Sequence, residues 1–165
     1  MNPSWLQSGF QVWQALTKAL DSLRAPAALA ARLYIAQVFF LAGLTKIRDW
    51  DTTILLFTEE YKVPLLTPEV AAIMGTAGEI VLPVLLLLGL AGRFSALGLS
   101  VVNVVAVISL SEIAPAALQQ HITWGVLLAA LALYGPGRWS VDCAWLKPWL
   151  TRQLTPAARA KLAMN

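Results

Sequence analysis

Four long runs of apolar residues, separated by short polar segments, follow one another along this chain. They predict helices over about 25–45, 69–93, 94–110 and 116–138. Each helix approaches the roughly 20 residues that cross the hydrocarbon core of a bilayer. Soluble helices of this length normally keep a polar face. We therefore predict an all-α, polytopic membrane protein built as a bundle of four transmembrane helices.

Two shorter segments also carry helical patterns. Residues 4–23 place apolar side chains, two of them tryptophan, at helical spacing, which predicts an amphipathic helix in the membrane interface; a partly disordered leader is the alternative. Residues 54–57 are apolar and stand among charged neighbours, which predicts a short surface helix between the first two spans. The expected parts are an interfacial helix over 1–24, a membrane domain over 25–142 and a basic, tryptophan-containing cytoplasmic tail over 143–165.

Composition agrees with a membrane protein and narrows its chemistry. Hydrophobic residues make up 58% of the chain and charged residues only 13%, against roughly 25% in soluble domains. The net charge of +3 includes no basic block that would indicate nucleic-acid binding. Cys143 is the single cysteine, so an intramolecular disulfide and a CxxC redox pair are excluded. Any redox role therefore needs a bound cofactor or a partner.

Basic residues are distributed unequally between the two sides of the four-span arrangement. One side receives Lys18, Arg24, Arg93, Arg138, Lys147, Arg152, Arg159 and Lys161. The other receives Lys46, Arg48 and Lys62. Under the positive-inside rule, this asymmetry predicts that both termini are cytoplasmic.

Two ionisable residues fall inside the predicted spans. Glu79 lies about 15 Å into the second span, and Arg32 lies about 10 Å into the first. Similar depths predict an intramembrane Arg32–Glu79 ion pair, with Asn103 and Gln37 in the same polar layer. Pro83 has no N–H, so the carbonyl of Glu79 loses its helical hydrogen bond.

Two interpretations of this polar layer stay open. Such a layer can be a cluster in which every polar group has a partner, and its role is then to fix helix packing. That is also the commoner role of a lone amide such as Asn103. It can instead be a pocket that binds a quinone headgroup, a small anion or a proton. Lys46 and His121 are secondary candidates, because Lys46 shares a helix face with Arg32 and His121 is the only histidine. His121 has no further ligand at suitable spacing, so no metal site is predicted, and no catalytic residue is identified.

Several short motifs recur in a definite order along the chain. They are Arg32-Leu33, Phe39, Gly43, Lys46, Val63-Pro64, Glu79, the leucine run over 85–88, Arg93 and the segment Gly-Pro-Gly-Arg-Trp-Ser-Val-Asp over 135–142. In this order they resemble the DoxX family of small bacterial membrane proteins, over roughly residues 29–142. The resemblance implies a four-helix, multi-pass protein of the bacterial inner (plasma) membrane.

The resemblance also bears on function. Similar members are linked with quinone-dependent thiosulfate oxidation, with membrane assemblies of superoxide dismutase and a sulfurtransferase, and with gene clusters for metal- or peptide-modifying oxidases. It implies an auxiliary membrane subunit of a redox, sulfur-oxidation or oxidative/metal-stress system, associated with quinone and a protein partner. The alternatives are a small transporter that works as a homo-oligomer with Glu79 as its coupling site, and a structural scaffold. The tryptophan-bearing N-terminal helix and basic tail depart from a typical short member, which suggests a cytoplasmic partner or tighter anchoring.

Overall fold

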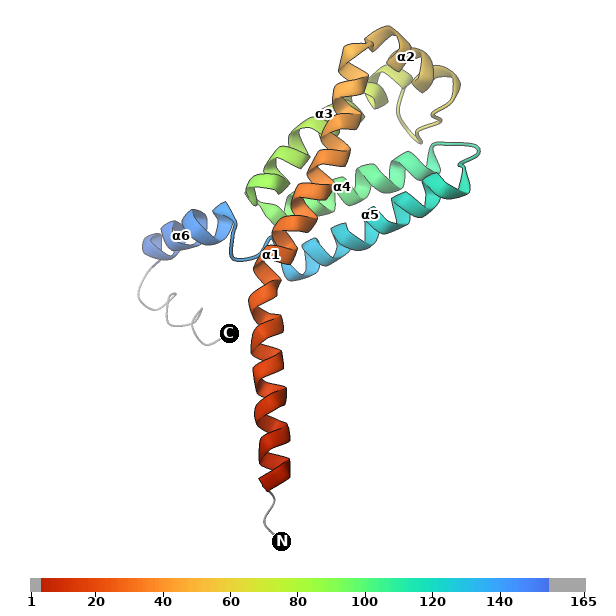
Figure 1. Cartoon of the computed structure of the whole chain (residues 1–165). Helices are drawn as coiled ribbons and strands as arrows, with labels where there is room; N and C mark the ends of the chain where they lie inside the picture. The colour runs from red at the N-terminus through yellow and green to blue at the C-terminus, as the bar shows by residue number, and fades with distance from the viewer. Residues whose placement is uncertain (1–3, 155–165) are drawn as a thin grey trace.

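The computed structural model describes residues 4–154, and these residues form helices and connecting turns without a strand. The elements are α1 (Ser4–Arg48), α2 (Trp50–Glu59), α3 (Pro68–Leu88), α4 (Gly92–Ile108), α5 (Pro115–Tyr134), the π-helix η1 (Asp142–Leu146) and α6 (Lys147–Gln153). The second half of α1 packs against α3 and α5, α4 packs along both of these helices, and α2 covers one end of the bundle (Figure 1). The all-α prediction is confirmed. Residues 1–3 and 155–165 of the predicted N-terminal helix and tail lie outside the described residues.

Three of these helices are long and apolar enough to cross a membrane: Gln7–Arg48 within α1, α3 and α5. The fourth, α4, is apolar but has only 17 residues, which is about 26 Å of helix. The chain is therefore an integral membrane protein in contact with lipid. A complete crossing by α4 stays a prediction, although α4 packs along both α3 and α5.

The first helix differs from the prediction at its start. We expected a new helix to begin near Ala25, but α1 runs through Pro26 without a break over 45 residues, or about 68 Å. The sequence around the proline, Leu23 to Ala31, is rich in strong helix formers that keep the helix going. The division of the chain at residue 24 stays a prediction.

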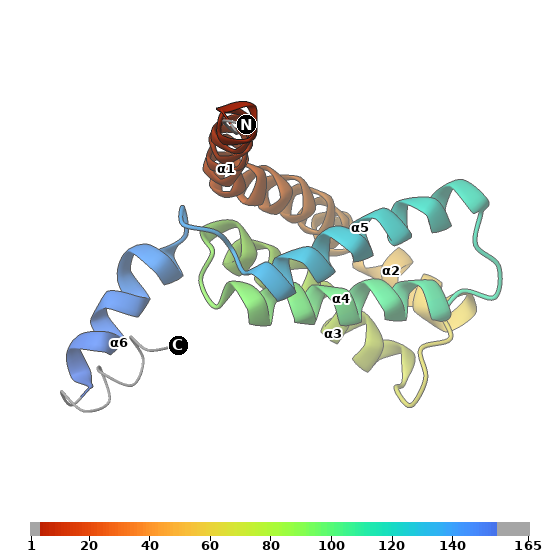
Figure 2. The same cartoon turned by 90° about the horizontal axis from the view of Figure 1, so that it is seen from below.

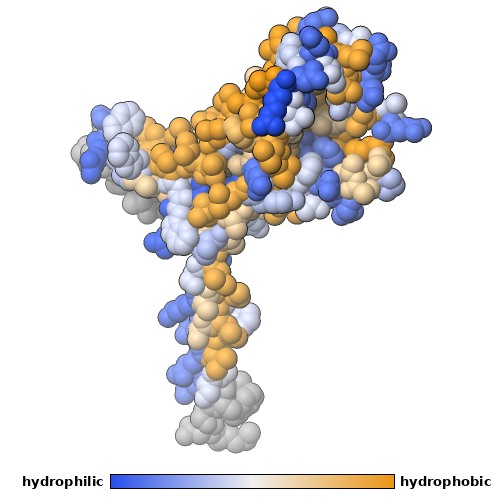
Figure 3. Space-filling view, turned by 45° about the horizontal axis from the view of Figure 1, so that its top comes forward, coloured by the Kyte–Doolittle hydropathy of each residue, from blue (hydrophilic) through white to orange (hydrophobic). Residues whose placement is uncertain are grey.

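The N-terminal half of α1 projects away from the bundle (Figure 1). Its apolar side chains are more than half exposed: Phe10, Trp13, Leu16, Leu20 and Leu23. They follow one side of the helix, and hydrophilic residues follow the other (Figure 3). The amphipathic pattern is thus present in the structure, while its place in the membrane interface stays a prediction.

Two apolar clusters hold the bundle together. The larger joins α1, α3, α4 and α5 through residues that are almost fully buried: Ile35, Phe39, Leu86, Ala96, Leu99, Leu128 and Leu131. The smaller packs Phe57 of α2 against Ala71 and Ala72 of α3. The Asp49 side chain begins α2 by accepting the Thr52 N–H at 3.0 Å. The predicted short helix between the first two spans is therefore confirmed.

The opposite end of the bundle is closed by the segment over 135–142. Gly89 ends α3 in the left-handed conformation, with φ of 65°. The Asp142 carboxylate then accepts hydrogen bonds from the Ala91 and Gly92 N–H groups at 2.9 and 2.8 Å. These N–H groups at the start of α4 have no partner within the helix, and Asp142 supplies it. From this end α6 leads away from the bundle (Figure 2).

Candidate functional site

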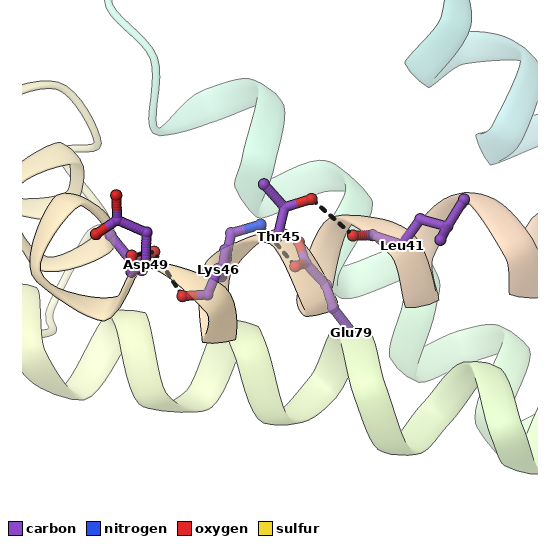
Figure 4. A network of polar contacts seen from close by, with 6 residues as sticks. Leu41, Thr45, Lys46, Asp49 and Glu79 are labelled. Carbon is purple, nitrogen blue, oxygen red and sulfur yellow. Dashed lines mark hydrogen bonds and ion pairs between the residues drawn. The ribbon is translucent and has the colours of Figure 1, made fainter.

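Glu79 forms an ion pair inside the bundle, but with a different partner from the one predicted. Its Oε2 lies 2.6 Å from Nζ of Lys46, which belongs to the last turn of α1 (Figure 4). The side chains are 10% and 22% exposed, so the pair is largely withdrawn from solvent. The predicted Arg32–Glu79 pair is wrong.

The register of α1 against α3 explains this partner. A Cβ added at Gly43 would lie 2.9 Å from Cδ1 of Ile80 and 3.1 Å from Cβ of Glu79, so the two helices approach closely at this glycine. Lys46 follows about one turn later and reaches the carboxylate. Arg32 lies 14 residues earlier, about 21 Å away along α1. Depths counted from the start of each span missed this offset because the first helix extends beyond the predicted span at both ends.

Arg32 belongs to the other end of the bundle, where it is fully buried. Its guanidinium donates to the Leu87 carbonyl at 3.1 Å and to the Trp139 carbonyl. The Leu87 carbonyl belongs to the last turn of α3, where a helix dipole favours a cation. Arg32 therefore clamps the segment after α5 onto the end of α3.

Asn103 also has an unpredicted partner, His121 of α5. Its Nδ2 donates to the His121 carbonyl at 2.9 Å, and its Oδ1 lies 2.8 Å from His121 Nδ1. A carbonyl only accepts, so the amide orientation is determined, and Oδ1 must accept a proton carried by Nδ1. The histidine is therefore the Nδ1–H tautomer, and no residue within 4–154 hydrogen-bonds to its Nε2.

An aromatic chain connects this second pair to α1. The His121 ring meets Trp124 edge to face at 4.8 Å between centroids, and Trp124 meets Phe39 at 5.8 Å. The Trp124 indole N–H also donates to the Tyr34 hydroxyl at 3.2 Å. These contacts orient the imidazole and join α5 to the bundle face of α1.

Gln37 lies apart from both pairs. It is exposed on the flank of α1 and contributes the one amide to an otherwise apolar groove of about 320 Å³. The other groove walls are Leu33, Ala36, Phe40, Pro83, Val84 and Leu87. The predicted layer of Arg32, Glu79, Asn103 and Gln37 is thus distributed over four separate environments.

The Lys46–Glu79 pair keeps unused hydrogen-bonding capacity. Lys46 uses one of its three N–H groups on Glu79, and within residues 4–154 Oε1 of Glu79 has no hydrogen-bond partner. Thr76 lies three residues before Glu79 on the same face of α3 and is 5% exposed. Its hydroxyl likewise has no partner in this part of the chain. Donors and an acceptor therefore lie near one another in a nearly dry site.

The loop after α2 passes close to this site. Its backbone is tied to the end of α4 by the Lys62 N–H, which donates to the Ser109 carbonyl at 2.8 Å. Burial raises the pKa of Tyr61 in this loop, and the negative charges of Glu60 and Glu79 raise it further. The Tyr61 side chain also packs against the cluster of Phe57, Ala71 and Ala72, so the loop lies along the half of α3 that precedes Glu79.

Sequence reasoning placed the correct face of α1, but it missed two members of the site and ranked a third too low. Arg32 and Lys46 were expected on one face, and both contact the bundle, as do Phe39 and Gly43 between them. Thr76 and Tyr61 were missed because neither hydroxyl stands out in its segment. Lys46 was ranked behind Arg32, although the close-approach glycine one turn away was a usable signal for its partner.

Comparison with family models gives a match over more than half of the chain. The family model DoxX matches residues 27–112, from just after Pro26 to just beyond α4. No curated protein and no solved structure matches the chain.

Proposed function

This chain belongs to the DoxX family, and we propose that it is an auxiliary membrane subunit of a redox system that binds a quinone headgroup at Lys46, Glu79 and Thr76. The systems that fit are those of sulfur oxidation and of oxidative or metal stress. The observation that carries the proposal is the unused hydrogen-bonding capacity of a buried ion pair within the spans.

The chemistry of the three side chains suits both redox forms of a quinone. An oxidised quinone has only acceptor oxygens, which need donors such as the remaining Lys46 N–H groups and the Thr76 hydroxyl. A hydroquinone also donates, and Oε1 of Glu79 is an acceptor. The paired charges of Lys46 and Glu79 cancel, so the site favours a neutral headgroup over a free anion.

An auxiliary role follows from what the chain can supply by itself. Cys143 is its single cysteine, so it has no second thiol for a dithiol–disulfide couple. Electrons for a bound quinone would come from a protein partner, and the subunit would hold and orient the quinone in the bilayer. No residue of the chain is assigned a catalytic role.

The test is purification in mild detergent followed by mass spectrometry of co-purified quinone. Thr76→Val removes a hydroxyl that makes no hydrogen bond within the described chain, so it should not weaken folding. We expect about fivefold less quinone per protein, the effect of roughly 1 kcal/mol of hydrogen bonding. Glu79→Gln should reduce it further, because the Lys46 ammonium loses its counter-charge.

The matched control is Thr45→Val. Thr45 is exposed beside Lys46 and donates to the Leu41 carbonyl at 3.0 Å on the same helix (Figure 4). Its quinone content should equal that of the parent protein. Equal quinone in Thr76→Val, Glu79→Gln and the parent would refute the site. A parent protein that carries no quinone would refute the ligand and leave the transporter and scaffold functions.

A further inference from the structure

A second hollow lies at the other end of the bundle, between the end of α3 and the segment that follows α5. Its volume is about 660 Å³, and its walls include Leu88, Arg138, Trp139, Ser140 and Trp145. Leu88 is the last residue of α3, so the hollow opens where a spanning helix leaves the membrane. This end is the predicted cytoplasmic side.

The walls of this hollow are held in place by contacts already described for the closing segment. Arg32 donates to the Trp139 carbonyl from one side, and Asp142 accepts the N–H groups of Ala91 and Gly92 from the other. The Ser140 hydroxyl donates to the Gly137 carbonyl at 2.7 Å. The backbone that carries Arg138, Trp139 and Ser140 is therefore anchored to the bundle at several points.

The polar groups that remain available in the hollow are donors. Arg138 is exposed, and its guanidinium has no hydrogen-bond or ion-pair partner among residues 4–154. The indoles of Trp139 and Trp145 are 60% and 79% exposed, and their N–H groups are likewise unpaired in that part of the chain. The closest carboxylate in sequence, Asp142, is engaged by the start of α4. The hollow therefore suits an anion and disfavours a cation.

We propose that this hollow binds an anionic phospholipid. The phosphate would lie against Arg138 and the indole N–H groups, and an acyl chain would follow the apolar side chain of Leu88 into the bilayer. Three features of the site favour a lipid: a donor-only polar set, apolar walls and exposed tryptophans at the level of the headgroups. This lipid site shares no residue with the proposed quinone site, so each proposal can fail without the other.

The experiment uses the full chain in nanodiscs that contain equal amounts of zwitterionic phosphatidylcholine and anionic phosphatidylglycerol. Native mass spectrometry of the released protein counts the lipids that stay bound. We expect preferential retention of phosphatidylglycerol by the parent protein. Arg138→Gln should retain about fivefold less of it, because one basic side chain near a membrane surface contributes a binding free energy of about that size.

Two further variants make the result specific. Arg48→Gln removes an exposed arginine at the opposite end of the bundle and should leave retention unchanged. Trp145→Leu keeps the charge of Arg138 but removes an indole N–H, and should reduce retention less than Arg138→Gln does. Circular dichroism checks that each variant keeps its helices. Equal retention of the two lipids by the parent protein, or equal loss in Arg48→Gln and Arg138→Gln, would overturn the proposal.

Discussion

Two pairs of polar side chains bury their polar groups within the spans, and the two pairs differ in charge. Lys46 and Glu79 join α1 to α3 as ions, whereas Asn103 and His121 join α4 to α5 as neutral partners through two reciprocal contacts. An ion pair must recover the desolvation of two charges, while a neutral pair has far less to recover. The neutral pair uses both ends of its amide, but the ionic pair leaves donors and an acceptor unused. The comparison indicates that α4–α5 is a packing contact and that α1–α3 is the better place for a ligand.

The largest expected effect comes from removing half of the ionic pair. Glu79→Ala leaves the Lys46 ammonium without a counter-charge at a site where it is only 22% exposed, and should lower the free energy of unfolding by about 3 kcal/mol. Denaturant unfolding in detergent, followed by circular dichroism, measures this change. Glu112→Ala removes an exposed carboxylate and should stay within about 0.5 kcal/mol of the parent. Equal losses in the two variants would show that the pair is unimportant for stability.

The next effect concerns the glycine that brings the ionic pair together. Gly43→Ala places a Cβ 2.9 Å from Ile80 Cδ1 and should destabilise the protein by about 1–2 kcal/mol while it pushes α1 from α3. Gly9→Ala is the control, because a Cβ there meets nothing within 4 Å and the change should favour the helix. The same unfolding measurement compares them. A Gly43→Ala variant as stable as Gly9→Ala would mean that the helices separate without cost.

The neutral pair should respond less to its own disruption. Asn103→Leu removes the two contacts to His121 and should cost about 1 kcal/mol, since the histidine is neutral and partly exposed. Nitrogen-15 NMR of the imidazole should show the Nδ1–H tautomer in the parent and a mixture in the variant. An Nε2–H tautomer in the parent would contradict the assigned amide orientation.

The smallest expected effect is a change in the pKa of Tyr61, which lies outside the spans and responds to the charge of Glu79. Burial and the charges of Glu60 and Glu79 hold the pKa of Tyr61 above 10.0. A raised folded-state pKa means that this contribution to stability is complete below pH 10.0 and is lost as the pH rises through the folded-state value. Glu79→Gln should lower the pKa of Tyr61 in an ultraviolet titration, with Tyr61→Phe to assign the signal. An unchanged titration would place the loop outside the influence of the ion pair.

Sequence patterns predicted the helices better than the contacts between them. Apolar periodicity was sufficient for the helical class, the surface helix and the inward face of α1, because burial of apolar surface selects the same side of a helix in any bundle. It could not distinguish Arg32 from Lys46 as the partner of Glu79, because helix register depends on side-chain packing at Gly43 and Ile80. The continuation of α1 through Pro26 and the contact of the closing segment with Arg32 could not be predicted either. The first depends on helical backbone hydrogen bonds and the second on a backbone carbonyl that accepts from the guanidinium, and side-chain patterns encode neither.

Because α1 is unbroken, its N-terminal half outside the bundle is joined rigidly to the half inside the bundle. At 100° per residue, Gln14 and Asp21 fall within about 40° of the direction of Lys46, so polar residues outside the bundle lie in line with its inward face. A torque applied to the N-terminal half is carried along about 68 Å of helix to the ion pair. Pro26 is a point at which that rotation can be absorbed, because its nitrogen carries no hydrogen and one helical hydrogen bond is missing there. A surface or partner that holds the exposed apolar residues of the N-terminal half is thus connected through one helix to the contact between Lys46 and Glu79.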